Sequence, residues 1–179
     1  MIEVANITKG DQLNKSNMQK IGKYPVINGG VSPSGYVDMF NCNENTITVA
    51  QGGSVGFVSF LESKFWLGAH AYSVIPNQDT LKKYQYDYGT FNRLMFHVLK
   101  NKQYDLEKTK VGVGIPSISK DFLDNIKIPL TSKNIQEKIV KILDKFESLI
   151  SEAKGLLPKE ITLRQKQFEY YREKLLSFK

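Results

Sequence analysis

The side chains best suited to covalent or metal chemistry are few and scattered. The soft metal ligands are Cys42, His70 and His97, and none of them lies at the spacing that a zinc site uses. A nucleophilic pair of Cys42 and His70 stays open as an alternative, although the local sequence NCNEN has no recognisable group that activates a thiol. These residues favour a protein that binds over one that catalyses.

Two glycine-rich segments, at 51–56 (QGGSVG) and 111–116 (VGVGIP), are the candidates for a phosphate-binding loop. Neither has GxGxxG spacing or a GK[ST] ending, so a nucleotide site is not predicted. Both are typical of loops whose backbone turns sharply or approaches another group closely. The chain also lacks a recognisable S-adenosylmethionine loop and a nuclease carboxylate cluster. We therefore expect no catalytic site, no metal and no cofactor on this chain.

Charge and composition restrict the class of protein. The 179 residues carry a formal net charge of +7, which favours a polyanionic partner but also fits a plain lysine-rich surface. A hydrophobic share of 41% indicates a globular protein and excludes a disordered tail. The single cysteine fits a reducing compartment, and no apolar run approaches the ~20 residues of a membrane span. We expect a cytoplasmic protein.

The elements that position these residues change character along the chain. Short β-branched or aromatic runs separated by turn residues predict strands in residues 23–76. Apolar residues at helical spacing predict a helix over 91–99, Ser119 is a candidate N-cap, and NIKIPL predicts a last strand over 125–130. The predicted strands are YPVIN (24–28), TITVA (46–50), VGFVSF (55–60), KFWLG (64–68) and AYSVI (71–75).

The last fifty residues predict helices with a heptad pattern. Ser132 is the candidate N-cap, and Gly155 with Pro158 predicts a break between two helices, the first about 34 Å long at ~1.5 Å per residue. Two apolar seams joined by a tight turn favour a coiled-coil arm over a hairpin that folds back on its own core. The seam residues predicted to pack are Ile135, Ile139, Ile142, Phe146, Leu149, Ile161, Phe168, Tyr171 and Leu175.

Several separate motifs, in order, resemble one known family. KYPVINGGVSPSGYVD (23–38), NTITVAQGGSVGFVSF (45–60) and KFWLGAHAYSVIP (64–76) resemble the target-recognition domain of type I restriction–modification specificity subunits. GIPSISKDFLDNIKIPL (114–130), running into IQEKIVKILDKFESLI (135–150), resembles the junction with a conserved helix. LPKEITLRQKQFEYYREKLL (157–176) resembles the family's distal helix.

The resemblance implies a fold and a domain division. The expected class is α+β: a compact, mixed or antiparallel β-rich recognition domain in residues 1–130, followed by a helical coiled-coil arm in residues 131–179. A complete specificity subunit carries two recognition domains and two helical regions, and this sequence has one of each with no internal repeat. It resembles a half-subunit: a natural half-length protein, a product of a shuffled locus, or an excised C-terminal half.

The resemblance also implies function and partners. Members of the family read double-stranded DNA without catalysing a reaction and hold methyltransferase subunits, which the restriction and translocase subunits join. S-adenosylmethionine, ATP and Mg²⁺ are expected in those partners. We expect a homodimer through the arm, whose two readers, with centres about one DNA turn or somewhat more apart, would recognise an inverted repeat with an unread spacer. A protein-interaction adaptor that uses only the arm is the alternative, besides a small enzyme using Cys42 and His70.

A DNA reader needs side chains that pair with base edges and cations that neutralise phosphates. Each candidate also has a plain structural interpretation, as a core tyrosine or a solvated lysine. The candidates for base contact are Asn28, Ser32, Ser34, Tyr36, Gln51, Ser54, His70 and Tyr72. The candidates for phosphate contact are Lys9, Lys15, Lys20, Lys23, Lys108, Lys110 and Lys120.

Overall fold

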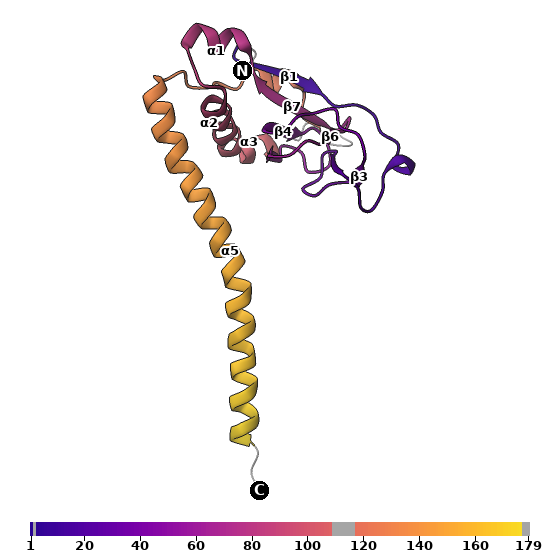
Figure 1. Ribbon diagram of the computed structural model, residues 1–179, viewed down its shortest axis with the longest axis vertical. Helices are drawn as coiled ribbons and strands as arrows, with labels where there is room; N and C mark the ends of the chain where they lie inside the picture. Colours follow the sequence, from indigo (N-terminus) through magenta and orange to yellow (C-terminus); the bar gives the residue numbers. More distant parts are fainter. Residues whose placement is uncertain (2, 109–116, 177–179) are drawn as a thin grey trace. The chain divides into compact units, whose positions relative to one another are not determined.

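The computed structural model describes residues 1, 3–108 and 117–176, and it mixes strands and helices (Figure 1). The chain divides into two compact units, Met1–Glu137 and Lys138–Lys179, which are described separately. The elements of the first unit are β1 (Ala5–Lys9), the 3₁₀ helix η1 (Lys15–Asn17), β2 (Tyr24–Ile27), β3 (Tyr36–Val37), β4 (Thr46–Ala50), β5 (Val58–Leu61), β6 (Trp66–Leu67), β7 (Ala71–Pro76), α1 (Gln78–Tyr84), α2 (Tyr88–Asn101), α3 (Gln103–Lys108) and α4 (Lys120–Asp124).

A four-stranded antiparallel sheet forms the larger layer of this unit, in the order β1-β7-β4-β5. The central strands β4 and β7 are buried along most of their length, as their β-branched sequences TITVA and AYSVIP require. Strand β1 was not predicted from the sequence. It lies opposite β7, with Ala5 facing Pro76 and Lys9 facing Tyr72, and only Ala5 and Ile7 of its residues are buried. Such a short strand depends on its partner for its hydrogen bonds.

A smaller three-stranded sheet has the order β3-β2-β6, with β2 antiparallel to β3 and parallel to β6. The segment before β2 is joined to β3 of this sheet, because Gln19 and Tyr36 exchange backbone hydrogen bonds of 2.8 and 2.9 Å. The two sheets meet where β6 leads into β7. The expected α+β class with a mixed and antiparallel β region is confirmed.

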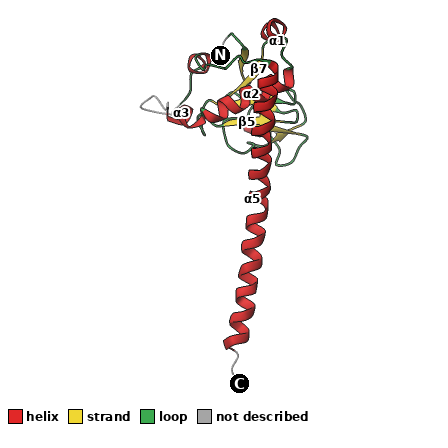
Figure 2. Cartoon of the chain, turned by 90° about the vertical axis from the view of Figure 1, so that its left-hand side faces the viewer, coloured by secondary structure: helices red, strands yellow, loops and turns green. Residues whose placement is uncertain are grey.

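Helix α2 covers the larger sheet, packing on β5 and β7 (Figure 2). Its residues Phe91, Met95 and Leu99 are fully buried, so the helical spacing predicted for 91–99 is confirmed. Ser119 caps α4 by accepting the N–H of Phe122, as predicted. The strand predicted for NIKIPL is wrong: residues 125–130 have no regular structure. Its alternating isoleucines are half-buried, but no neighbouring strand pairs with them.

The predicted break at Gly155 and Pro158 is also wrong. Helix α5 runs without interruption over Lys133–Leu176, and the first unit holds only its first turn (Figure 1). Proline removes one backbone donor and distorts a helix locally, but here the strong helix formers on both sides outweigh that cost. The Thr162 hydroxyl donates to the Pro158 carbonyl, at 2.9 Å. At ~1.5 Å per residue, α5 spans about 66 Å, roughly twice the length expected for the first helix.

Candidate nucleic-acid interface

Three loops from different strands meet at one end of the sheets in the first unit. They are residues 28–35 after β2, 51–56 after β4 and 68–70 after β6, and we call them the three-loop cluster. The His70 carbonyl accepts the N–H of Gln51 at 2.8 Å, and the Gly29 carbonyl accepts the N–H of Ser54 at 2.8 Å. The Asn28 side-chain oxygen accepts the N–H of His70 at 3.0 Å. These bonds hold the three loops to one another.

Glycine is required where the first two loops of the cluster touch. Gly29 has φ +87°, and a Cβ there would lie 2.5 Å from the Gly52 carbonyl oxygen and 2.8 Å from that of His70. Gly53 has φ +69°, and its Cβ would lie 2.9 Å from the Gly29 oxygen. Both positions combine a left-handed backbone with close approach, which L side chains tolerate poorly. The GG pairs predicted as sharp turns therefore also set the distance between loops.

Gln51 and Tyr72 hold the cluster in place from inside. The Gln51 amide nitrogen donates to the Tyr72 hydroxyl at 2.9 Å, and the backbone N–H of Ile118 donates to the Gln51 carbonyl at 3.0 Å. Tyr72 is only 5% exposed, and burial, followed by the Asp121 carboxylate, raises the pKa of its hydroxyl. The prediction that Tyr72 contacts DNA needs correction, because a central strand buries its ring. Tyr72 and Gln51 are positioning residues for these loops.

The polar side chains that remain accessible on the cluster are mostly short. Ser32, Ser34 and His70 are exposed, and Asn28 and Ser54 are half-buried. Asn28 uses its side-chain oxygen within the cluster, and its amide nitrogen is a further hydrogen-bond donor. Five of the eight residues predicted for base contact thus remain accessible on the cluster.

The predicted phosphate contacts lie around the unit instead of forming one patch. All the lysines among them that the structure describes are exposed. Lys15 lies in η1, and Lys20 and Lys23 precede β2, so these three accompany the small sheet and the half-buried Tyr36 on β3. Lys9 ends β1, Lys108 ends α3 and Lys120 begins α4. Lys110 lies outside the described residues.

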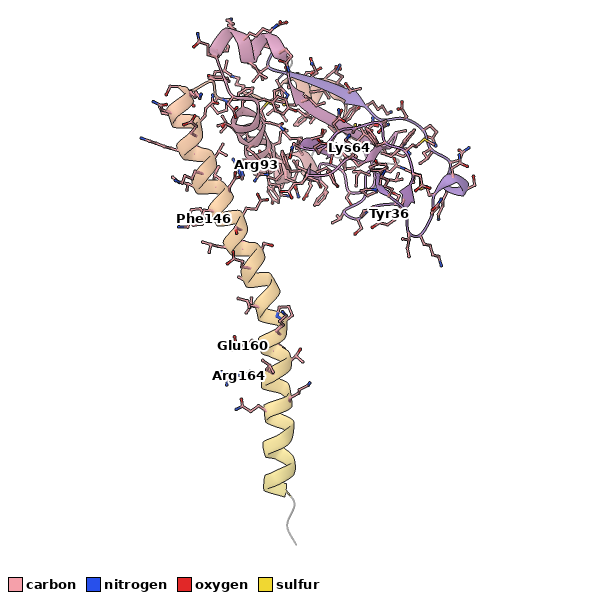
Figure 3. The ribbon with its side chains drawn as sticks, viewed as in Figure 1. Tyr36, Lys64, Arg93, Phe146, Glu160 and Arg164 are labelled. Atoms are coloured by element: carbon pink, nitrogen blue, oxygen red, sulfur yellow. The ribbon has the colours of Figure 1, made fainter. Side chains whose placement is uncertain are left out.

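A basic and aromatic surface on the small sheet was missed from the sequence. The rings of Tyr24 and Phe40 lie 5.1 Å apart, the ammonium group of Lys64 lies 4.6 Å from the Phe40 ring centre, and that of Lys23 lies 5.3 Å from the Tyr24 ring centre. Figure 3 shows Lys64 and Tyr36 in the strand-rich part of the unit. The lysines of this surface are suited to neutralising phosphates. Only the strand pairing brings residues 23–24, 40 and 64 together.

The structure gives little support to the enzyme alternative. Cys42 is half-buried, and burial, followed by the nearby Asp11 carboxylate, raises the pKa of its thiol to about 11. A thiol with that pKa is almost entirely protonated near neutral pH and is a poor nucleophile. His70 holds the cluster through its backbone, and its imidazole is exposed. Cys42 is therefore better explained as a packing residue.

The predicted coiled-coil residues lie along α5. Ile135, Ile142, Phe146, Leu149 and Ile161 are all exposed, although they are large and apolar. Ile139 is on the same helix, and the side chains of Phe168, Tyr171 and Leu175 lie outside what the structure describes. The described part of the chain contains no helix long and apolar enough to cross a membrane.

Comparison with known proteins connects this fold to one family. The family model described as the type I restriction modification DNA specificity domain matches residues 2–163. A putative type I specificity subunit from Mycoplasma genitalium is 31% identical over 173 residues, which cover 96% of this chain and 42% of the relative. The specificity subunit of the type I restriction enzyme EcoR124I/EcoR124II from Escherichia coli is 40% identical over 108 residues, covering 59% of this chain and 24% of the relative.

A solved structure gives the same result. The crystal structure of the type I restriction–modification system S subunit from M. genitalium matches with a TM-score of 0.73 and 30% identity, covering 96% of this chain and 43% of that one. The chain therefore spans less than half the length of these relatives. The order of the motifs, the α+β fold and the match to residues 2–163 lead to one conclusion: this chain belongs to the family of type I restriction–modification DNA specificity domains.

Proposed function

We propose that the first unit reads a DNA sequence and that the chain acts as the DNA-specificity component of a type I restriction–modification enzyme. The observation that carries the proposal is the three-loop cluster. It gathers hydrogen-bonding side chains from three separate loops onto one rigid surface, which is what readout of base edges requires. The basic and aromatic surface of Lys23, Tyr24, Phe40 and Lys64 supplies cations for phosphates.

The remaining chemistry belongs to partners in this proposal. Methyltransferase subunits would bind S-adenosylmethionine, and a restriction and translocase subunit would bind ATP and Mg²⁺. This chain would be non-catalytic, which agrees with the raised pKa of Cys42. Two copies would pair through the exposed apolar face of α5, so that two readers recognise an inverted repeat.

The test is to coexpress the chain with a methyltransferase subunit, purify the complex and map the methylated sequence. We expect His70→Ala and Ser32→Ala to change which sequence is methylated, because both side chains are exposed on the cluster. Lys20→Ala should instead weaken binding to all DNA sequences and reduce its salt dependence. Lys82→Ala, at an exposed lysine on α1, is the matched control and should change neither.

Three outcomes would contradict the proposal. Copurification with a protein partner in the absence of any salt-dependent DNA binding would favour the adaptor alternative. Methyl transfer by the purified chain alone would show an enzyme. Unchanged sequence preference in the His70 and Ser32 variants would show that the reading surface lies elsewhere in the chain.

A further inference from the structure

Residues 126–130 (IKIPL), which connect α4 to α5, have the sequence of a strand without a strand beside them, and we call them the linker segment. Burial alternates along it: Ile126 and Ile128 are half-buried, while Lys127 and Pro129 are exposed. Alternation with a period of two is typical of a strand that packs one face on a core. The linker segment therefore has the side-chain pattern of an edge strand, although it pairs with no strand of the described residues.

The backbone of the linker segment has unused hydrogen-bonding groups. Lys127, Ile128 and Leu130 each have an N–H and a carbonyl for which the described residues provide no partner. Pro129 has a carbonyl and no N–H, and proline within sheets is found mainly in edge strands. A row of unpaired donors and acceptors is the feature with which an added strand pairs.

Hydrogen bonds hold both ends of the linker segment. At its start, the N–H of Ile126 donates to the Leu123 carbonyl of α4 at 3.2 Å. Directly after its end, the Thr131 carbonyl accepts from the Tyr86 hydroxyl at 2.6 Å and from the Gln136 side-chain amide at 3.1 Å. Gln136 is only 1% exposed, so this anchor is buried. The linker segment is thus held in place without being paired, which lowers the entropy cost of binding a partner.

Two grooves border the linker segment. One, of about 440 Å³, lies between the segment and α3 and has Leu106 and Phe122 among its apolar walls. The other, of about 480 Å³, lies between the segment and the first residues of the chain and has Val4 and Leu130 among its apolar walls. A ribbon of two strands is only marginally stable in water, so an added strand needs side-chain contacts as well. The two grooves supply places for those side chains.

Hydrogen bonding and charge identify the class of occupant. The phosphates and sugars of DNA accept hydrogen bonds without donating them, so they would leave the carbonyls of the linker segment unpaired. A polypeptide strand both donates and accepts. The charged side chains of the second groove are two carboxylates, of Glu3 and Asp124, and one ammonium group, of Lys127, in a chain whose net charge is +7. This lining favours basic side chains over phosphates.

We propose that the linker segment and its two grooves form a docking site for an extended segment of a partner protein, in which apolar and basic side chains alternate. The partner pairs with the linker segment as a β-strand, and five residues cover it, about 17 Å at ~3.3 Å per residue. Its apolar side chains enter the grooves, and its basic side chains lie near Glu3 and Asp124. The inference goes beyond the proposed function, because these residues belong neither to the three-loop cluster nor to the basic and aromatic surface.

Two synthetic six-residue peptides, capped at both ends, test the site on the full chain. One alternates valine with lysine, and the other alternates valine with glutamate. We expect the lysine peptide to bind with a Kd of about 1 mM or tighter, and the glutamate peptide at least about fivefold more weakly. Hydrogen exchange should slow at Ile128 and Leu130, which share one edge of a strand, because Pro129 leaves the other edge with one donor. Protection of neither amide by about 5 mM lysine peptide would overturn the proposal.

Methylating backbone nitrogens of the lysine peptide tests whether the two backbones pair. The N–H groups of alternate residues in a strand point toward opposite neighbours. Methylation of the valine nitrogens and methylation of the lysine nitrogens therefore block opposite edges of the peptide. We expect one of the two methylated peptides to lose binding and the other to retain it. Equal affinities of the two methylated peptides would contradict strand pairing.

A charge reversal tests the contact with Glu3. The Glu3 carbonyl accepts from the Asn77 side-chain amide and from the Thr80 hydroxyl, both at 2.9 Å, so Glu3→Lys should leave the backbone in place. It should weaken binding of the lysine peptide about fivefold and strengthen binding of the glutamate peptide. Glu44→Lys makes the same charge change at an exposed residue before β4, and this control should alter neither affinity. Equal effects of the two variants would contradict the site.

Two further measurements separate the docking site from other roles. Both variants should keep the DNA sequence preference of the wild type; loss of that preference in Glu3→Lys alone would show a DNA-reading surface and overturn the inference. Self-association in sedimentation that Glu3→Lys weakens and Glu44→Lys does not would assign the surface to a second copy, and would also overturn it. Absence of sequence-specific DNA binding in the wild type would contradict the proposed function and leave the docking site standing.

Discussion

The hydroxyl group of Tyr72 shows how a residue predicted to contact DNA takes a different role. It accepts from Gln51 at 2.9 Å, and a weaker bond of 3.5 Å runs to the Ile118 carbonyl. These contacts join β7 to the β4 loop and to the segment before α4. A buried hydroxyl with partners on two segments holds them in one arrangement, so its effect on DNA is exerted through the loops it positions.

We predict that Tyr72→Phe lowers the free energy of unfolding by about 1 kcal/mol, because it leaves the Gln51 amide without its acceptor. It should also weaken specific DNA binding more than nonspecific binding, because the cluster loses order. Tyr104→Phe, at an exposed tyrosine, is the control and should change stability by less than about 0.5 kcal/mol. Urea unfolding and DNA titration measure the two effects. Equal effects of the two substitutions would contradict the positioning role.

Helix α2 depends on its first turn as well as on its buried face. The Asp87 carboxylate accepts the N–H of Thr90 at 2.8 Å. The hydrogen bonds with Thr90 are the largest cause of the lowered pKa of Asp87. The pKa of Asp87 is lower in the folded state than in the unfolded state. The charged cap therefore contributes its full stability at pH values above the ordinary aspartate pKa, and this contribution is lost as the pH falls through the folded-state pKa.

We predict that Asp87→Ala reduces stability by about 1 kcal/mol at pH 7, the usual cost of losing an N-cap. Asp87→Asn retains a capping oxygen without a charge, so it should be destabilising by less. The difference in the free energy of unfolding between wild type and Asp87→Ala should shrink below about pH 4. The difference in the free energy of unfolding between Asp87→Asn and Asp87→Ala should not change there. Denaturant unfolding at pH 7 and pH 3 measures both; a difference for Asp87→Ala that does not change with pH would contradict the assignment.

Helix α5 provides a direct test of one continuous helix against a hairpin. A Cβ at Gly155 would meet no atom within 4 Å. In an uninterrupted helix, Gly155→Ala should therefore stabilise α5 by about 1 kcal/mol, with higher helicity in circular dichroism. Gly155→Asn, which suits a turn, should give a smaller gain. A loss of stability in Gly155→Ala would indicate that residue 155 forms a turn.

In the proposed homodimer, α5 would act as a ruler between the two readers. Two α5 helices paired along their full length in opposite directions would have their starts about 66 Å apart, since α5 spans about 66 Å. The sequence had predicted that the centres of the two readers lie about one DNA turn or somewhat more apart, from a helix about half as long as α5. The distance between the starts of the two α5 helices is therefore the length that an insertion in α5 can change.

We predict that inserting one heptad on each side of Gly155 preserves the dimer, because both insertions keep the heptad spacing of the apolar face. The helix starts should separate by about 21 Å more at ~1.5 Å per residue, and the unread spacer should lengthen by about 6 base pairs at ~3.4 Å each. Inserting both heptads on the same side of Gly155 adds the same length and is the control for the site of insertion. The methylated sequence and the mass in solution check this. An unchanged spacer in the symmetric variant would contradict the ruler.

The sequence by itself determined those elements whose patterns depend only on residues close together in the chain. Short aromatic or β-branched runs between turn residues predicted β2, β4 and β7, and the apolar face of 91–99 predicted α2, because these patterns are local. The order of the motifs was specific enough to indicate the family, which the comparisons confirmed.

Only the tertiary structure decided which elements pair and which residues meet. Strand β1 exists because β7 lies beside it, and residues 125–130 are no strand because no edge pairs with them. Tyr72 was excluded from the DNA contacts because its side chain, on the central strand β7, is buried. Tyr24, Phe40 and Lys64 became one surface through pairing between distant segments. Hydrogen bonds between strands and burial depend on neighbours far away in the chain, and local patterns do not specify those neighbours.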